Sequence, residues 1–122
     1  MPRVLIVDDS PTSRDALQGI LAADPEMEVI GFAEDGIQAI ARTKKLRPDV
    51  ITMDLNMPVM DGITLVHAVR RDGAHKNTPV IILTTETSEK RKADGERAGA
   101  TDWIVKPFNP PKLLQAINKV CA

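Results

Sequence analysis

Short apolar runs recur along the chain, each rich in Val and Ile. Within each run the apolar residues are nearly continuous rather than alternating with polar ones. This pattern favours strands that are buried on both faces of a sheet. The runs cover residues 4–7, 29–33, 50–53, 80–83 and 103–105.

The stretches between these runs have helical spacing. Ser10-Pro11 offers a helix N-cap followed by proline at the first helical position. Prolines at 25 and 48 mark the ends of the first two helices, because the residue before proline avoids the helical region. The expected apolar faces are Ala16, Leu17, Ile20 and Leu21; Ile37, Ile40 and Ala41; Ile63, Val66 and Val69, with Arg70 beside them; and Leu113, Leu114, Ile117 and Val120.

The fourth helical stretch, which begins at Ser88, differs from the others. It is charged almost all round, and alanine is its only apolar residue type. Gly95 lies inside it, where glycine costs about 1 kcal/mol relative to alanine. We therefore expect this helix to be the least firmly anchored to the sheet.

The order of elements is thus strand then helix, five times. Such alternation predicts an α/β fold: a doubly wound, five-stranded parallel sheet flanked by five helices and joined by right-handed crossovers. The chain has 122 residues and shows no internal repeat or linker. One domain over residues 1–122 is the expectation, with no second domain attached.

Composition narrows the classes of function. The 16 basic and 17 acidic residues give a net charge of −1, which supplies no electrostatic case for binding nucleic acid or an anionic membrane. Cys121 is the only cysteine, so no internal disulfide can form. No apolar stretch approaches the roughly 20 residues of a membrane span, and none resembles a signal peptide. The expected location is the cytoplasm.

Polar residues follow four of the five apolar runs. Parallel sheets bind ligands at the carboxyl ends of their strands, so these side chains should meet at one edge. Taken singly, each has an ordinary structural explanation, as a turn residue, a helix cap or a surface lysine. Their joint occurrence at one edge favours a site. The residues are Asp8 and Asp9, Asp54, Thr84 and Lys106.

The charges indicate a cation. Three carboxylates and one ammonium leave a deficit that a divalent ion would neutralise, and oxygen ligands without His or Cys select Mg²⁺. Such an ion would let Asp8 and Asp9 tolerate each other next to a buried strand. Loosely held Mg²⁺ engages phosphate oxygens, so the fitting chemistry is phosphoryl transfer, with Asp54 as the acceptor carboxylate.

These motifs resemble the receiver domain of two-component response regulators. The resemblance covers essentially the whole chain and rests on VDDS, MDLNMPVMDG, the threonine after VIIL, and the KP pair after WIV. It implies the flavodoxin-like strand order 2-1-3-4-5, which is carried over from the resemblance, since CheY has that order. The second half of the chain is most similar to stand-alone CheY-type chemotaxis regulators. The first half is also similar to the receiver of chemotaxis methylesterases.

The resemblance assigns roles to single residues. Asp54 is implied as the phosphoacceptor, with Asp9 binding Mg²⁺ directly and Asp8 through water. Asn56 would give the metal a backbone carbonyl. Thr84 would be the switch hydroxyl and Trp103 the switch aromatic, a position where the family usually has Tyr or Phe. The remaining implied roles are Lys106 as the ammonium beside the phosphoryl group, a cis peptide bond between Lys106 and Pro107, and Asn56 with Glu86 as residues that tune dephosphorylation.

The function implied is a phosphorylation-driven switch that accepts its phosphoryl group from a CheA-like histidine kinase. Its expected output is the flagellar motor switch, a phosphatase is a further implied partner, and the protein is expected to be a monomer. It would catalyse its own phosphorylation and dephosphorylation, but it is expected to be a signalling protein and not an enzyme. Two alternatives stay open: a phosphate sink or relay without an output partner, and an aspartyl-phosphate phosphohydrolase. The latter is disfavoured because Asn56, not an acid, follows Asp54 by two residues.

Overall fold

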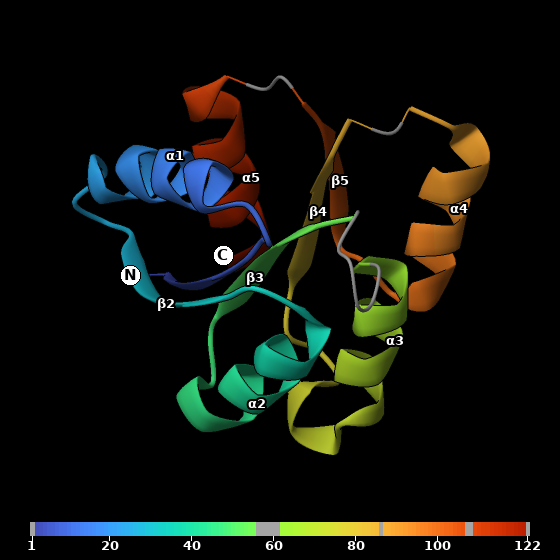
Figure 1. Ribbon diagram of the computed structural model, residues 1–122. Coiled ribbons are helices and arrows are strands. Elements are labelled where there is room, and N and C mark those ends of the chain that lie inside the picture. Colours follow the sequence, from blue (N-terminus) through green and yellow to red (C-terminus); the bar gives the residue numbers. More distant parts are fainter. Residues whose placement is uncertain (1, 56–61, 86, 107–108, 122) are drawn as a thin grey trace.

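The computed structural model describes residues 2–55, 62–85, 87–106 and 109–121. In this part of the chain, strands and helices alternate as the sequence predicts (Figure 1). A short 3₁₀ helix, Gly73–His75, precedes the fourth strand. The strands are β1 (Arg3–Val7), β2 (Glu28–Ala33), β3 (Val50–Asp54), β4 (Val80–Thr84) and β5 (Asp102–Val105). The helices are α1 (Pro11–Ala22), α2 (Gly36–Leu46), α3 (Gly62–Arg71), α4 (Glu89–Ala98) and α5 (Pro110–Cys121).

The strands form one five-stranded parallel sheet in the order β2-β1-β3-β4-β5, which confirms the predicted fold class and order. The pairs β1–β2, β1–β3, β3–β4 and β4–β5 are all parallel. β3 is central, so its last residue, Asp54, lies in the middle of the sheet edge. The expectation that every strand is buried on both faces is wrong for β2 and β5. Both are edge strands, and most of their residues keep partial exposure.

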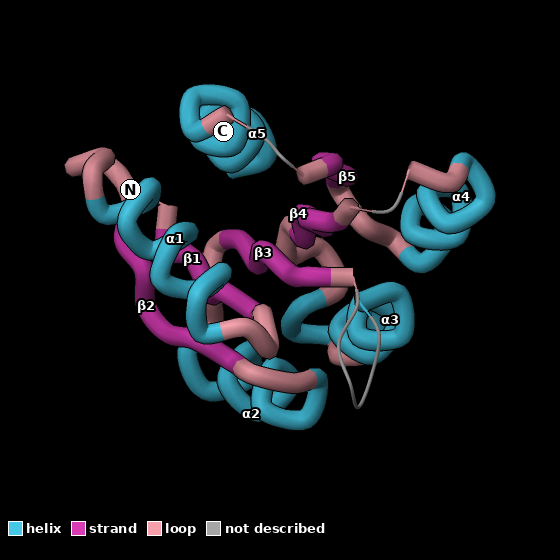
Figure 2. The backbone as a smooth tube through the Cα atoms, turned by 45° about the horizontal axis from the view of Figure 1, so that its top comes forward, coloured by secondary structure: helices cyan, strands magenta, loops and turns pink. Residues whose placement is uncertain are grey.

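The helices cover both faces of the sheet (Figure 2). α1 and α5 lie on one face, where Leu17 and Leu113 pack with Ile6 of β1 in one core cluster. α2, α3 and α4 lie on the other face, where Val66 packs with Ile82 of β4 in a second cluster. This two-sided packing is the doubly wound architecture.

Side chains at the helix starts fix where several helices begin. Ser10 caps α1, accepting a hydrogen bond from the Ser13 amide at 3.3 Å, and Pro11 follows at the first helical position, as predicted. Asp35 caps α2 by accepting from the Gln38 amide at 2.8 Å. Ser88 caps α4 by accepting from the Arg91 amide at 3.4 Å. The first two caps begin helices directly beyond β1 and β2, at the sheet edge that carries the acidic residues.

The predicted apolar face of α2 is wrong for two of its three residues, since Ile40 does pack against the core cluster on that side of the sheet. Ile37 is 65% exposed and Ala41 is also exposed. The residues that α2 turns inward are Gly36, Ala39 and Thr43. Small residues at these positions let the helix lie close to the sheet, and a hydrophobicity pattern ranks them below isoleucine.

The expectation that α4 is weakly anchored agrees with its burial. Its only buried residues are Gly95 and Ala98, both in its C-terminal half. Beyond this half, the guanidinium of Arg70 donates to the Gly99 carbonyl from Nε at 3.2 Å and from Nη2 at 2.9 Å. The same guanidinium donates from Nη1 to the carbonyl of His75 at 3.1 Å and to that of Thr78 at 2.5 Å. One side chain from α3 therefore fastens the C-terminal end of α4.

Among the described residues, the helices are too short or too polar to pass through a bilayer.

Candidate functional site

The five residues that the sequence places at the carboxyl ends of the strands do come to one edge of the sheet. Asp8 and Asp9 directly follow β1, Asp54 is the last residue of β3, and Thr84 is the last residue of β4. Lys106 directly follows β5. The edge is set by topology: in a parallel sheet all strands end on the same side, and β1, β3 and β4 are neighbours.

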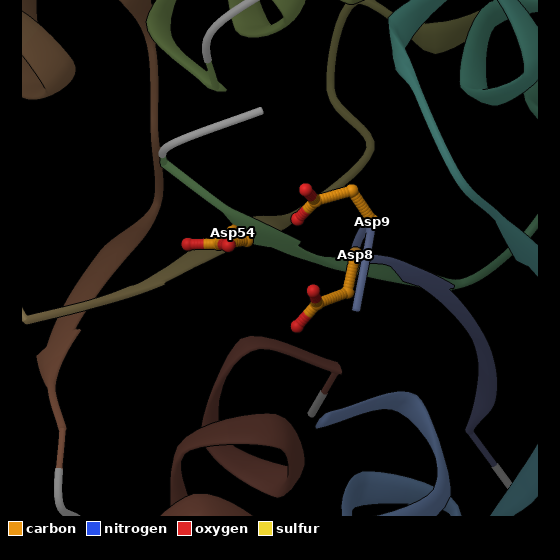
Figure 3. Close-up of side chains that lie close together, drawn as sticks. All are labelled: Asp8, Asp9 and Asp54. Carbon is orange, nitrogen blue, oxygen red and sulfur yellow. The ribbon is translucent and has the colours of Figure 1, made fainter. Parts of the chain in front are cut away.

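Three carboxylates form the centre of this edge. One oxygen from each of Asp8, Asp9 and Asp54 lies within 4.8 Å of the others. Figure 3 shows the three side chains projecting to the same side, two from the end of β1 and one from the end of β3. Asp8 is 1% exposed, Asp54 is half-buried and Asp9 is exposed. The cluster thus runs from the protein interior to solvent, open on the side of Asp9.

The buried carboxylate of Asp8 has two partners. Its Oδ1 accepts a hydrogen bond from the Ser10 amide at 2.9 Å, and its Oδ2 lies 3.9 Å from Lys106 Nζ. The Lys106 side chain is 24% exposed, so this ion pair is largely shielded from water. A buried charge is tolerated when it is paired and hydrogen-bonded, which resolves part of the repulsion between Asp8 and Asp9.

The donor set fits Mg²⁺. An octahedral ion with bonds of about 2.0–2.1 Å needs its ligand oxygens roughly 3 to 4 Å apart. The three carboxylate oxygens lie within 4.8 Å of one another, which is close to that spacing. All three donors are hard oxygens, the type that Mg²⁺ prefers. The ion would remove the repulsion that Lys106 alone leaves among three anions.

Thr84 and Trp103 lie on the neighbouring strands β4 and β5, where Thr84 pairs with Val105 and Trp103 pairs with Ile82. Thr84 is fully buried at the end of β4, and its carbonyl accepts a hydrogen bond from the Lys106 amide at 2.7 Å. Trp103, on β5, is half-buried and packs against the cluster covered by α2, α3 and α4. Its indole lies against Gly95 of α4.

Some of the predicted site residues cannot be placed. Asn56, Glu86 and Pro107 lie outside the described residues. The metal-binding carbonyl, the tuning positions and the cis peptide bond therefore remain predictions from the resemblance.

Arg14 is a site neighbour that the sequence reasoning missed. Its Nη1 donates to the Asp8 backbone carbonyl at 2.8 Å, and its Nη2 lies 3.8 Å from Glu34 Oε1. Arg14 thus links the start of α1, the loop after β1 and the loop after β2. The available signal was its place in the first turn of a helix that begins right after the acidic pair.

Comparison with known proteins identifies the family. The family model described as "Response regulator receiver domain" matches residues 4–118. This chain belongs to the response regulator receiver domain family. Its fold and strand order are those the resemblance implies.

Relatives of this receiver domain include a chemotaxis protein and several methylesterases. The chemotaxis protein CheY of Bacillus subtilis is 39% identical over 117 residues, covering 96% of this chain and 95% of that protein. A protein-glutamate methylesterase/protein-glutamine glutaminase of Nocardioides is 41% identical over 120 residues, covering 97% of this chain and 32% of that protein. The chain thus spans about a third of the length of the curated methylesterases that it matches.

Solved structures of response regulators are also similar to this chain. The chemotaxis response regulator CheY4 of Vibrio cholerae is 47% identical, with a TM-score of 0.86 and 98% of each chain covered. The response regulator domain of Thermotoga maritima CheB is 36% identical, with a TM-score of 0.90, covering 99% of this chain and 96% of that one. The receiver parts of both protein types are therefore similar to this chain over nearly its full length.

Proposed function

We propose that this receiver domain is a phosphorylation-activated switch of a two-component system that controls chemotaxis. Asp54 accepts a phosphoryl group from a CheA-like histidine kinase. The observation that carries the proposal is the cluster of Asp8, Asp9 and Asp54 within 4.8 Å, with Lys106 3.9 Å from Asp8. Such a cluster at the end of a central strand suits phosphoryl transfer to a carboxylate.

The proposed reaction is a displacement at phosphorus. An Asp54 carboxylate oxygen forms a bond to the phosphorus of a phosphohistidine, and the bond from phosphorus to the imidazole nitrogen breaks. The electron pair of that bond stays on the nitrogen, which takes up a proton from water. Hydrolysis later returns Asp54 to a carboxylate and releases inorganic phosphate. Asp54 suits this role because it is half-buried at an edge open to solvent on the Asp9 side.

The neighbouring residues prepare this site for an anionic donor. Asp9 and Asp54 would hold Mg²⁺, with Asp8 acting through a water and the Asn56 carbonyl completing the set. The ion would neutralise charge on the phosphoryl oxygens when bound. The buried Asp8 carboxylate accepts a hydrogen bond from the Ser10 amide and lies beside the Lys106 ammonium. Lys106 and the Thr84 hydroxyl are proposed to contact the phosphoryl oxygens.

The switch is proposed to act through Thr84 and Trp103. A phosphoryl group on Asp54 adds charge and strong acceptor oxygens beside the end of β4, where Thr84 lies. Movement of Thr84 toward them would alter the packing around Trp103, which contacts α4 at Gly95. Since α4 buries only Gly95 and Ala98, a population shift in its position needs little energy.

The proposed output is the flagellar motor switch, and a phosphatase is a further proposed partner. The similarity to CheY over nearly the full length of both proteins favours this output. The likeness to the CheB response regulator domain favours a second candidate, regulation of a methylesterase. A phosphate sink has the same chemistry without an output partner. In each case we propose one receiver domain over residues 1–122, a cytoplasmic location, a monomeric state and a signalling role rather than catalysis on a metabolite.

Phosphorylation is tested with acetyl phosphate and Mg²⁺, followed by rapid quench and intact-mass measurement. Wild type should gain the mass of one phosphoryl group, and Asp54→Asn should not. An adduct on Asp54→Asn at the wild-type level would refute the acceptor assignment.

The metal site is tested by thermal melting with and without Mg²⁺. Asp9→Ala should lose most of the Mg²⁺-induced rise in melting temperature. Asp15→Ala is the matched control, because it removes an exposed carboxylate from α1 outside the cluster. Equal Mg²⁺ responses in wild type and Asp9→Ala would refute the site.

The output is tested by direct binding of a purified motor-switch protein, with and without Mg²⁺ and beryllofluoride. Binding that depends on beryllofluoride and disappears in Asp54→Asn supports the motor-switch output. Absence of binding in protein whose activation is shown by Trp103 emission would favour the sink or the methylesterase alternative.

A further inference from the structure

A cavity of about 440 Å³ lies between α2 and the C-terminal end of α3. α2 leads into the start of β3, and the turn after α3 leads into the start of β4. The cavity is therefore at the edge of the sheet opposite the three carboxylates, and the helices that flank it are neighbours in Figures 1 and 2. Its volume lies within the range of roughly 300–1,000 Å³ that is typical of small-molecule sites.

Two buried polar side chains line this cavity. Thr43 of α2 is 2% exposed, and its hydroxyl oxygen has no hydrogen-bond partner among the residues that the structure describes. A buried hydroxyl left unpaired costs about 1–3 kcal/mol, so this group calls for an explanation. His75 is 4% exposed, and its Nδ1 lies 3.2 Å from the Thr78 hydroxyl. When Thr78 donates to Nδ1, the imidazole carries its proton on Nε2, which is then available to an acceptor.

The charged residues around the cavity favour an anion. Lys44 and Arg71 line it, against the single carboxylate of Asp72. Cations in the last turn of a helix also interact favourably with the helix dipole, which accounts for part of this charge without any ligand. The dipole does not account for the unpaired hydroxyl of Thr43 or the buried imidazole.

One wall of the cavity is apolar, formed by Ile40 of α2 and by Ala68 and Val69 of α3. An apolar wall next to a cationic rim suits a ligand with two chemically different parts. We propose that the α2–α3 cavity binds a small molecule that joins a phosphate group to an apolar ring system, such as a mononucleotide. Lys44, Arg71 and the His75 ring contact the phosphate. Ile40 and Val69 contact the ring system, and the Thr43 hydroxyl donates to a polar atom of the ligand after a small side-chain rotation.

The test is a titration of isotope-labelled protein followed by amide NMR shifts, with adenosine monophosphate as the probe and no Mg²⁺ present. The expected result is saturable shifts of the amides of Thr43, Lys44, Asp72 and His75. Adenosine lacks the phosphate and inorganic phosphate lacks the ring, so each should bind at least about tenfold more weakly, a loss of about 1.4 kcal/mol. The titration is repeated in the Asp54→Asn variant, so that shifts caused by phosphorylation of the acceptor carboxylate are excluded.

Single variants distinguish specific binding in the cavity from a non-specific attraction of the phosphate to basic side chains. Lys44→Ser should weaken binding about tenfold, while Lys45→Ser should leave it unchanged. The two lysines are adjacent on α2, but Lys45 lines a different depression beside β2, so they form a matched pair. Thr43→Val, which keeps the side-chain shape, should also weaken binding.

Three results would overturn the proposal. One is the absence of saturable shifts up to about 10 mM ligand, a concentration far above a useful affinity. Another is equal weakening by Lys44→Ser and Lys45→Ser, which would indicate general charge attraction at the helix ends. The third is that Thr43→Val and His75→Gln both fold, as judged by the same spectra, and both bind like wild type.

Discussion

Replacing Gly95 by alanine sets helix propensity against packing. Gly95 lies inside α4, where alanine is favoured over glycine by about 1 kcal/mol. Propensity alone therefore predicts that Gly95→Ala stabilises the protein. The structure predicts the opposite, because the space that a Cβ would fill already holds the edge of the Trp103 indole.

The size of the conflict follows from the distances. A Cβ on Gly95 would lie 2.9 Å from Trp103 Cζ3, 3.1 Å from Cε3 and 3.5 Å from Ile82 Cδ1. Carbon atoms make favourable contacts at about 3.5–4.0 Å, so the indole must move outward by roughly 0.6 Å or more. Overpacking of this kind costs about 1–3 kcal/mol. After subtracting the propensity gain, we expect a net loss of about 1 kcal/mol.

The assay is a double-mutant cycle in urea, followed by far-ultraviolet circular dichroism because one variant lacks tryptophan. Gly95→Ala should lower the unfolding free energy by about 1 kcal/mol in wild type and raise it by about 0.5–1 kcal/mol in Trp103→Leu. The pair Lys92→Ala and Lys92→Gly, at an exposed position of α4, measures propensity alone. The emission of Trp103 should change in Gly95→Ala, since the indole is displaced.

One outcome would refute this reasoning. If Gly95→Ala stabilises wild type and Trp103→Leu by the same amount, the indole does not occupy the glycine's side of α4. The packing contact that we propose to link Trp103 to α4 would then be absent as well.

Single variants test three further features: a buried hydroxyl, the Arg70 guanidinium and the Cys121 thiol. Thr52→Val should raise the unfolding free energy by about 1 kcal/mol, because the buried Thr52 hydroxyl has no partner in the described part of the chain. Thr101→Val should lower it, because the Thr101 hydroxyl accepts a hydrogen bond from the Val80 amide at 3.0 Å. Arg70→Met should lower the unfolding free energy by about 2–3 kcal/mol, because it leaves three backbone carbonyls without their guanidinium donor. This guanidinium is partly desolvated, and burial lowers its pKa. Arg71→Met, at an exposed position, should lower the unfolding free energy by less than about 0.5 kcal/mol. Burial, and to a smaller extent the charge of Asp49, raises the pKa of the Cys121 thiol. Alkylation of Cys121 by iodoacetamide at mildly alkaline pH should therefore be slower in folded than in urea-unfolded protein. Asp49→Asn should speed the alkylation of the folded protein. Because the folded pKa is the higher one, this thiol's contribution to stability is lost as pH rises through that pKa.

The fold and the position of the site were accessible from the sequence for a topological reason. Once five strands alternate with five helices, the sheet is parallel and every strand ends at the same edge. Residues that follow the strands are then brought together whatever the details of packing. This is why Asp8, Asp9 and Asp54 could be expected within reach of one ion, and why Lys106 could be expected beside them.

Features that depend on how closely a helix approaches the sheet could not be predicted from the sequence in the same way. The inward face of α2 is made of Gly36, Ala39 and Thr43, and the pattern of apolar residues selected the face of Ile37 instead. Gly95 was interpreted only as a weak point of a helix, whereas it is the place where Trp103 fits. In both cases a small residue marks a close contact, and hydrophobic periodicity gives small residues little weight.

The net charge of the chain also concealed a feature of the fold, namely where the charged residues lie. The net charge of −1 argued against an electrostatically driven partner, yet a sum over the chain ignores position. In this fold the ends of the strands and the starts of the helices share one edge, and the helix C-termini share the other. Helix dipoles favour cations at those C-termini. α2 and α3 end in Lys44, Lys45, Arg70 and Arg71, while Asp8, Asp9 and Asp54 gather at the opposite edge. Topology thus brings an acidic cluster to one edge of the sheet and the basic ends of α2 and α3 to the other. The acidic cluster repels an anionic phosphoryl donor until a cation binds there, and the basic helix ends attract anions without any metal.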